Sequence, residues 1–251
     1  MKICVFDTET ISVDKPFCYN VGYIIYDTEK KETVLKKEFV VEQIWHNIAL
    51  FSTAYFAEKR PVYVTSMRAK KSILKKWGYI CQEMIRDFKI FNVDYAYAYN
   101  SPFDDRVFNF NCDFFKTMNP FDNIDIIDIA GLVHNKIAFS KSYQDFCENN
   151  NLFTESGNYS TTAENVTKYL MNNIDFIEDH TALSDCEIEL QILLHCINMN
   201  CEFGISYKKY QSIPRKVNKL LTLIDKKDNT ELSFEYQKIR INKDRTKIIL
   251  D

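Results

Sequence analysis

The stretch ICVFDTET, residues 3–10, decides the fold that this sequence predicts. Its first residues are apolar and its end carries Asp7 and Glu9, so it is typical of a buried strand that ends in acid. Residues two apart on a strand point to the same face, about 6.6 Å apart along it. The two carboxylates are therefore expected on one surface at a strand end. Taken alone, the pattern D-x-E is common, and a solvated strand end would also explain it.

Two further apolar runs, at residues 20–27 and 34–41, predict an antiparallel meander with the first strand. Residues 42–90 are predicted to be helical, because apolar residues from Ile73 to Phe88 recur at spacings of three and four, and Arg60 with Pro61 is expected to divide this region. Strands are predicted at 95–99 and 124–129, and helices at 102–116, 128–136, 141–149, 162–172 and 182–200. This order predicts an α/β fold with a mixed sheet flanked by helices.

Residues 1–204 are expected to form one domain that includes the helical segment 42–90, and residues 205–251 a small C-terminal extension. The extension begins with a basic stretch at 208–219 and ends in an alternating, hairpin-like pattern. In segment 42–90, the basic residues are either a phosphate-binding face or a solvated helix face. They are Arg68, Lys70, Lys71, Lys75 and Lys76.

The composition excludes several classes of protein. No run of about 18 apolar residues occurs, so no membrane span or membrane partner is expected, and the absence of an apolar leader predicts a cytoplasmic protein. The net charge of −3 does not itself indicate nucleic-acid binding. The eight cysteines form no C-x-x-C pair and are expected to be reduced and buried. A zinc site of Cys186, His195, Cys196 and Cys201 is disfavoured, because adjacent helical residues point to different faces.

Asp104 follows the strand predicted at 95–99, where α/β proteins usually place ligand sites. Pro102 lies just inside the expected helix start, with Asn100 or Ser101 as its cap. An acid at a helix N-terminus also favours the helix dipole, and Asp105 suits that role equally well.

His180 and Asp185 are five residues apart, which in an ideal helix places their side chains about 140° apart. They can share a site only if His180 precedes the helix. A capping box of Ser184 and Glu187, or Thr181 as the cap, would begin the helix at the right place.

Three motifs thus follow one another: FDTET at 6–10, NSPFD at 100–104 and HTALSD at 180–185. In this order they resemble the DEDD exonuclease superfamily, whose second and third motifs are N-x-x-F-D and H-x-A-x-x-D. The chain resembles the histidine branch, which includes the proofreading subunits of bacterial replicases, because the residue four before Asp185 is Thr181 rather than tyrosine. The motifs lie within residues 3–200, about four fifths of the chain.

The resemblance implies a ribonuclease H-like fold and two divalent cations, Mg²⁺ or Mn²⁺. Asp7 would bridge both metals, Glu9 and Asp185 would complete the first site, and Asp104 would serve the second, directly or through water. Carboxylate oxygens suit such hard cations. His180 would be the general base, since imidazole titrates near neutral pH.

The resemblance also implies substrate contacts. Thr8 and Thr10 would lie near the terminal nucleotide, and Asn100 and Phe103 along the cleft wall. Asp128 is a further acid that would either support the site from behind or cap a helix.

The expected function is a 3′→5′ exonuclease that releases nucleoside monophosphates from single-stranded DNA or frayed 3′ ends. Its partner would be a nucleic acid with a free 3′ end, with DNA favoured over RNA. Three alternatives stay open. They are an exoribonuclease acting on short RNA, a non-catalytic nucleic-acid-binding module, and a proofreader that docks on a replication partner through residues 205–251.

Overall fold

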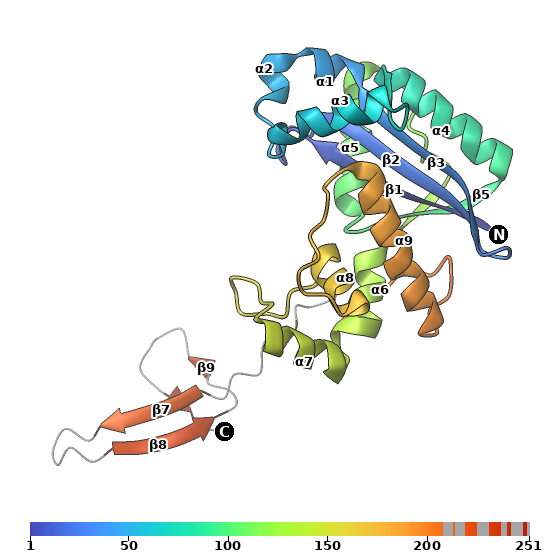
Figure 1. Ribbon diagram of the computed structural model, residues 1–251. Helices are drawn as coiled ribbons and strands as arrows, with labels where there is room; N and C mark the ends of the chain where they lie inside the picture. Colours follow the sequence, from blue (N-terminus) through green and yellow to red (C-terminus); the bar gives the residue numbers. More distant parts are fainter. Residues whose placement is uncertain (208–212, 214–218, 225–230, 237–239, 242–247, 250–251) are drawn as a thin grey trace. The chain divides into compact units, whose positions relative to one another are not determined.

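The computed structural model describes residues 1–207, 213, 219–224, 231–236, 240–241 and 248–249 (Figure 1). The chain forms two compact units, residues 1–152 with 160–211, and residues 153–159 with 212–251. In the second unit, β7 (Lys219–Ile224) pairs antiparallel with β8 (Glu231–Tyr236), and β9 (Arg240–Ile241) with β10 (Ile248–Ile249). The predicted basic stretch at 208–219 lies almost entirely outside the described residues, and the predicted boundary near residue 204 stays a prediction.

A six-stranded sheet forms the centre of the first unit. Its strands are β1 (Lys2–Thr10), β2 (Cys18–Asp27), β3 (Glu32–Val41), β4 (Ile73–Lys75), β5 (Val93–Ala98) and β6 (Asp125–Asp128). They lie in the order β4-β3-β2-β1-β5-β6. The first three are antiparallel, as predicted, whereas β5 and β6 run parallel to β1. The mixed sheet predicted from the sequence is confirmed, and the acidic end of β1 lies at its centre.

Eleven helical elements are described. They are α1 (Glu42–His46), α2 (Ile48–Phe51), η1 (Ala57–Lys59), α3 (Arg60–Arg68), α4 (Trp77–Phe91), α5 (Pro102–Phe115), α6 (Ile129–Val133), η2 (His134–Ala138), α7 (Lys141–Asn150), α8 (Ala163–Met171) and α9 (Ala182–Asn198). Pro61 lies in the first turn of α3, where proline costs no hydrogen bond. A helix therefore begins at Arg60, as predicted, but residues 42–90 hold five helical elements rather than the two helices that a single break would give.

Segment 42–90 was predicted to be helical throughout, and this prediction is wrong. Residues Ile73–Lys75 form the edge strand β4, which pairs parallel with β3 through Ile73 and Phe39. The side chain of Ile73 is 44% exposed, so its spacing from the buried stripe of α4 was coincidental. The basic residues of this segment lie at the end of α3, in the turn and on β4, rather than on one helix face. Lysines on an edge strand discourage pairing with other chains.

The two faces of the sheet are covered by different helices (Figure 1). Cys4 and Phe6 of β1 pack with Trp77 and Met84 of α4 and with Phe108 of α5 in the main core. The opposite face of β1 and β2 is covered by α9. Because alternate residues of β1 face opposite ways, Asp7 and Glu9 lie on the side of α9.

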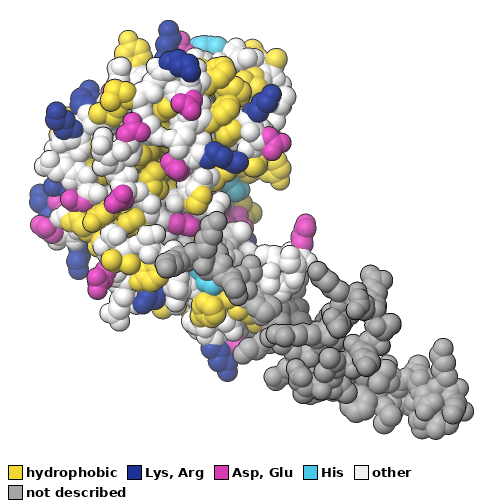
Figure 2. Space-filling model, turned by 180° about the vertical axis from the view of Figure 1, so that it is seen from behind, with side chains coloured by type: hydrophobic (Ala, Val, Ile, Leu, Met, Phe, Trp, Pro, Cys, Tyr) yellow, Lys and Arg dark blue, Asp and Glu magenta, His cyan; other side chains and the backbone are white. Residues whose placement is uncertain are grey.

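Three features that the composition predicted can be compared with the described residues: the distribution of charge, the membrane-spanning helices and the state of the cysteines. Figure 2 shows basic and acidic side chains interspersed over one face of the first unit. Within the described residues, no helix is long and apolar enough to cross a membrane. All eight cysteines are buried thiols outside any disulfide, as predicted. Among the described residues, no cluster of three or more potential metal ligands includes a cysteine.

Candidate active site

The end of β1 carries both acids of the first motif. Asp7 lies opposite Gly22 of β2, and Glu9 lies opposite Asn20. The register shifts between Glu9 and Thr10, so the regular ladder ends just beyond the second acid. Both acidic side chains are partly buried. The predicted placement of the two carboxylates on one face at a strand end is confirmed.

The N-terminus of α9 lies directly on Gly22. A Cβ atom at Gly22 would lie 2.4 Å from the carbonyl carbon of Ala182 and 2.4 Å from the backbone nitrogen of Leu183. Asn20 Oδ1 accepts a hydrogen bond from the N–H of Ala182 at 2.8 Å, and the Glu38 carboxylate accepts one from the N–H of Leu183. These bonds satisfy donors that a helix start leaves open. The sheet itself therefore holds α9 in place.

Of the two caps predicted for α9, the capping box of Ser184 and Glu187 is wrong, and Thr181 is correct in position only. Thr181 occupies the N-cap position, but its side chain makes no capping hydrogen bond. Ser184 donates its hydroxyl to the carbonyl of Thr181 at 3.0 Å, and Glu187 pairs with Lys36 at 2.6 Å. The capping box does not form because Asn20 and other residues of the sheet already bind the first N–H groups of the helix.

His180 and Asp185 lie on either side of the helix start. Because α9 begins at Ala182, His180 belongs to the preceding segment and Asp185 to the first turn, as their spacing required. His180 has a φ of +46°, which few non-glycine residues adopt. Ligand atoms of Glu9, His180 and Asp185 all lie within 4.8 Å of one another. The first and third motifs therefore meet in space.

Asp104 joins the site from the first turn of α5. Its side chain is 3% exposed, and its Oδ1 accepts a hydrogen bond from the Thr8 hydroxyl at 2.6 Å. Asp105 instead accepts a hydrogen bond from Asn109 at 3.0 Å, on its own helix. This geometry distinguishes the two neighbouring acids, which the sequence alone left equivalent. Asp104 is the acid that meets β1.

Asp128 holds the backbone in front of α5. Its Oδ1 accepts hydrogen bonds from the N–H groups of Ala130 at 3.0 Å, Asn100 at 2.9 Å and Ser101 at 3.4 Å. The first bond makes Asp128 the cap of α6. The other two fix the turn from which α5 begins, so both suggested roles are present. Ser101 occupies the N-cap position of α5, as one of the two predicted alternatives had it, but its side chain makes no capping hydrogen bond.

The acids raise one another's pKa values. Burial raises the pKa of Asp7, and the charge of Asp104 raises it further. Burial and the charge of Asp185 do the same for the pKa of Glu9. Burial brings the pKa values of Asp104 and Asp185 to about 7. Lys59 counteracts part of this effect by lowering the pKa of Glu9. Such a cluster gains stability from protons or bound cations.

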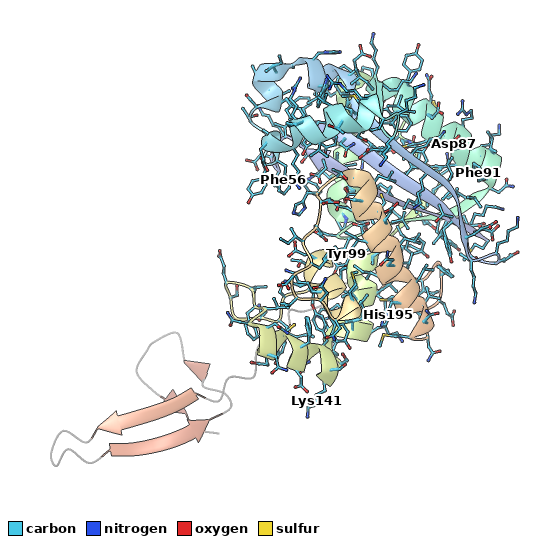
Figure 3. All side chains as sticks on the ribbon, in the orientation of Figure 1. Phe56, Asp87, Phe91, Tyr99, Lys141 and His195 are labelled. Atoms are coloured by element: carbon cyan, nitrogen blue, oxygen red, sulfur yellow. The ribbon has the colours of Figure 1, made fainter. Side chains whose placement is uncertain are left out.

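Segment 42–90 reaches the predicted base. The rings of Phe56 and His180 are stacked, with centroids 4.3 Å apart and planes within 15° (Phe56 is labelled in Figure 3). Lys59 donates a hydrogen bond to the carbonyl oxygen of Asp179, and Glu178 Oε2 lies 3.8 Å from His180 Nδ1. Burial, and then the charge of Lys59, lower the pKa of His180 below its ordinary value. The ring is thus packed and kept neutral at lower pH.

Four residues of this site were not predicted from the sequence: Phe56, Lys59, Glu178 and Glu189. The first three lack a motif, and only the folded chain brings them to His180. Glu189 could have been found from the sequence, because it is an acid within the apolar run IELQILLHCI, one helical turn after Asp185. Burial raises its pKa, as do the charges of Asp104 and Asp185.

The predicted substrate contacts occupy different positions. Thr8 is 6% exposed and uses its hydroxyl to hold Asp104. Thr10 lies beyond the register shift, partly buried. Asn100 has a φ of +58° in the turn before α5. Phe103 is partly buried, and its ring lies 5.4 Å from the guanidinium of Arg106.

The side chains at this site are suited to a hard divalent cation. Asp7, Glu9, Asp104 and Asp185 offer carboxylate oxygens from three separate elements, β1, α5 and α9. Oxygen ligands of this type are those that Mg²⁺ and Mn²⁺ prefer. Within the described part of the chain, the buried Oε2 atom of Glu189 also has no hydrogen-bond partner. The residues present therefore fit the metals that the motifs imply.

Comparison with known proteins identifies the fold. No protein-family model and no curated protein matches the chain. Among solved structures, the nuclease domain of 3′hExo, a DEDDh family member bound to rAMP, matches with a TM-score of 0.55 at 16% identity, covering 83% of this chain and 97% of that domain. This chain shares the fold of that nuclease domain. The ribonuclease H-like architecture predicted from the motifs is thereby confirmed.

Two other solved structures share this fold. A full-length 3′-exonuclease matches with a TM-score of 0.52 at 15% identity, covering 85% of this chain and 68% of that one. E. coli Exonuclease I in complex with a dT13 oligonucleotide matches with a TM-score of 0.50 at 18% identity, covering 78% of this chain and 40% of that one. Similarity at these identities establishes the fold, and the activity has to be argued from the site.

Proposed function

We propose that this chain is a divalent-metal-dependent 3′→5′ exonuclease that releases nucleoside monophosphates from single-stranded DNA or frayed 3′ ends. One observation carries the proposal: the acids of three distant motifs converge on the acidic end of β1, with the ring of His180 beside Glu9 and Asp185. The fold shared with the nuclease domain of a DEDDh family member supports it.

Each residue has a distinct part in the proposed reaction. Asp7, Glu9, Asp104 and Asp185 would hold two Mg²⁺ or Mn²⁺ ions. When bound, these ions stabilise the negative charge that develops on the phosphoryl oxygens. His180 Nε2 or Nδ1 accepts the proton of the attacking water, since its lowered pKa keeps the ring neutral.

Substrate binding is proposed for Thr10, Asn100 and Phe103, with Thr8 acting first through its bond to Asp104. Phe103 offers an aromatic ring on which a base can stack, a contact that tolerates any sequence. Asn100 lies in the turn held by Asp128, so its position depends on that cap.

A digestion assay with matched variants tests the proposal. Purified protein with Mn²⁺ should shorten a 5′-labelled single strand one nucleotide at a time, and a chelator should stop it. Asp7→Ala and Asp185→Ala should abolish cleavage, because each removes a metal ligand. Asp104→Asn should be inactive, whereas Asp105→Asn should be nearly normal, since the Asp105 carboxylate accepts a hydrogen bond from Asn109 of its own helix. Intact DNA and RNA after incubation with metal would refute the proposal.

The same assay separates the alternatives. The neighbours were solved with rAMP in one case and with dT13 in another, so they favour neither sugar. Faster digestion of RNA than of matched DNA would identify an exoribonuclease, which must contact the 2′-hydroxyl. Binding without cleavage, unchanged by Asp7→Ala, would indicate a binding module. Docking on a replication partner through residues 205–251 stays a prediction, because most of that segment lies outside the described residues.

A further inference from the structure

Glu189 is a buried acid that the four-acid set leaves unexplained. It lies one helical turn after Asp185, on the same face of α9, and is 4% exposed. Its neighbour two positions earlier, Glu187, shows the ordinary alternative, with its side chain 46% exposed and paired with Lys36. Burying a carboxylate without a partner is costly, so a chain retains one only where something compensates it.

The groups around Glu189 offset only part of the cost of burying its carboxylate. The carboxylate accepts one hydrogen bond from the backbone N–H of Tyr99, just beyond the end of β5 (Tyr99 is labelled in Figure 3). Its Oε2 atom has no hydrogen-bond partner among the described residues. The charges of the Asp104, Asp185 and Glu178 carboxylates all raise its pKa, and the charge of Glu189 in turn raises the pKa of Asp7. The open oxygen thus lies among acids, where a cation is the natural partner.

A purely structural role does not explain the residue. The bond to the Tyr99 amide needs one acceptor oxygen, which glutamine would supply without a charge. Packing against the sheet would be met by leucine, as at Leu190 next to it. A partner that binds the second carboxylate oxygen accounts for a glutamate at this position.

We propose that Glu189 is a fifth carboxylate of the metal centre, binding a divalent cation directly or through a bound water beside Asp7 and Asp104. The inference rests on the proposed function, because the cation is one of the two that the four acids would hold. It adds a ligand to that set. A carboxylate in this position strengthens binding of the cation on the side of α5, where Asp104 supplies one ligand.

Binding of Mn²⁺ alone, measured by calorimetry without nucleic acid, tests the role of Glu189. Glu189→Gln keeps the shape and the acceptor for Tyr99, and should weaken Mn²⁺ binding by about 10- to 100-fold. Glu187→Gln, on the same helix but exposed, is the matched control and should bind as the wild type does. Mn²⁺ should also raise the thermal unfolding temperature less in Glu189→Gln than in the wild type.

Three outcomes distinguish the inference from the proposed function. If Asp185→Ala loses Mn²⁺ binding and Glu189→Gln binds like the wild type, the metal centre stands and the inference is overturned. If neither variant changes Mn²⁺ binding, both fail. Should Glu189→Gln not fold, Glu189→Leu removes both carboxylate oxygens and keeps an apolar side chain like that of Leu190 beside it, and unchanged Mn²⁺ affinity in that variant would likewise overturn the inference.

Discussion

The ring of Phe56 lies flat on the ring of His180, with centroids 4.3 Å apart. Phe56 immediately precedes η1, in the segment 42–90 whose role the sequence left open. Lys59, at the end of η1, contacts the carbonyl of Asp179, so the same short stretch packs the ring and holds the backbone before it. This segment thereby becomes part of the candidate active site.

Removing the stacked ring should impair cleavage. In Phe56→Ala the imidazole of His180 loses its packing partner, and a base displaced by about 1 Å can cost about 100-fold in rate. We expect a fall of about 10- to 100-fold in the single-turnover rate on a labelled oligonucleotide, with Mn²⁺ affinity retained. Ile48→Ala, at an exposed position of the same segment, is the control. Equal losses in the two variants would show that the stack has no specific role.

The dependence of cleavage on pH should reflect the lowered pKa of His180. Neutral imidazole is the active form of a base, so the rate should rise with pH and reach half its maximum below the ordinary histidine value of about 6.5. Lys59→Ala removes a charge that lowers the pKa of His180. The rising limb of the pH–rate profile should therefore move to higher pH in this variant. Rates of wild type and variant across the range from about pH 5 to about pH 9 provide the measurement.

His180→Ala should lower the rate by about 10²- to 10⁴-fold and remove that limb of the profile, while Mn²⁺ binding is largely kept. A normal turnover in this variant would mean that another group accepts the proton. A shift of the limb to lower pH in Lys59→Ala would contradict the electrostatic role of Lys59.

Parts of this site follow from the sequence for clear physical reasons. Strands and motifs are local patterns, so β1, the position of Asp104 after β5 and the placement of His180 before α9 could all be predicted. The support of α9 could not, because Asn20 and Ala182 are 162 residues apart and nothing in either stretch indicates their hydrogen bond. The sequence instead predicted a capping box of Ser184 and Glu187, because these two residues have the spacing of that motif.

Segment 42–90 shows the same limit. Its apolar spacing predicted helices correctly around Trp77 but assigned Ile73 to a helix, because three residues of edge strand carry too little pattern to be recognised. The contacts of Phe56 and Lys59 with the segment before α9 join parts of the chain about 120 residues apart. Only the fold brings these residues to the site.

The metal-free protein should lose stability as pH rises. Burial raises the pKa values of Asp104 and Asp185 to about 7 in the folded state, against about 4 when unfolded. The folded state therefore binds protons more tightly, and this contribution is full below about pH 4 and is lost as pH rises through about 7. Each unit of difference in pKa corresponds to about 1.4 kcal/mol.

Thermal unfolding of chelator-treated protein should show a falling midpoint between about pH 5 and about pH 8, which added Mn²⁺ reverses. Asp104→Asn removes one buried charge and keeps the acceptor for Thr8, so at about pH 8 it should be more stable than the metal-free wild type while lacking activity. If the variant were less stable than the wild type at that pH, this would contradict the destabilisation that we assign to the buried charge of Asp104.

Gly22 should be the position at which the smallest change has a large effect. A Cβ atom there would lie 2.4 Å from backbone atoms of α9, which cannot yield as a flexible side chain can. Gly22→Ala should therefore displace the start of α9, which carries Asp185, and cost about 1–3 kcal/mol in free energy of unfolding. Cleavage should fall more than stability alone explains, because the metal ligands no longer meet.

Gly78→Ala provides the matched control for this prediction. Gly78 lies in the first turn of α4, and an added Cβ would meet only the methyl group of Thr117 at 3.1 Å. Alanine is favoured over glycine in helices by about 1 kcal/mol, which offsets that contact, so stability and cleavage should stay near those of the wild type. Urea unfolding and oligonucleotide digestion of both variants give the comparison. If Gly22→Ala cleaves as well as Gly78→Ala, the close seating of α9 on β2 is not what brings Asp185 to Asp7.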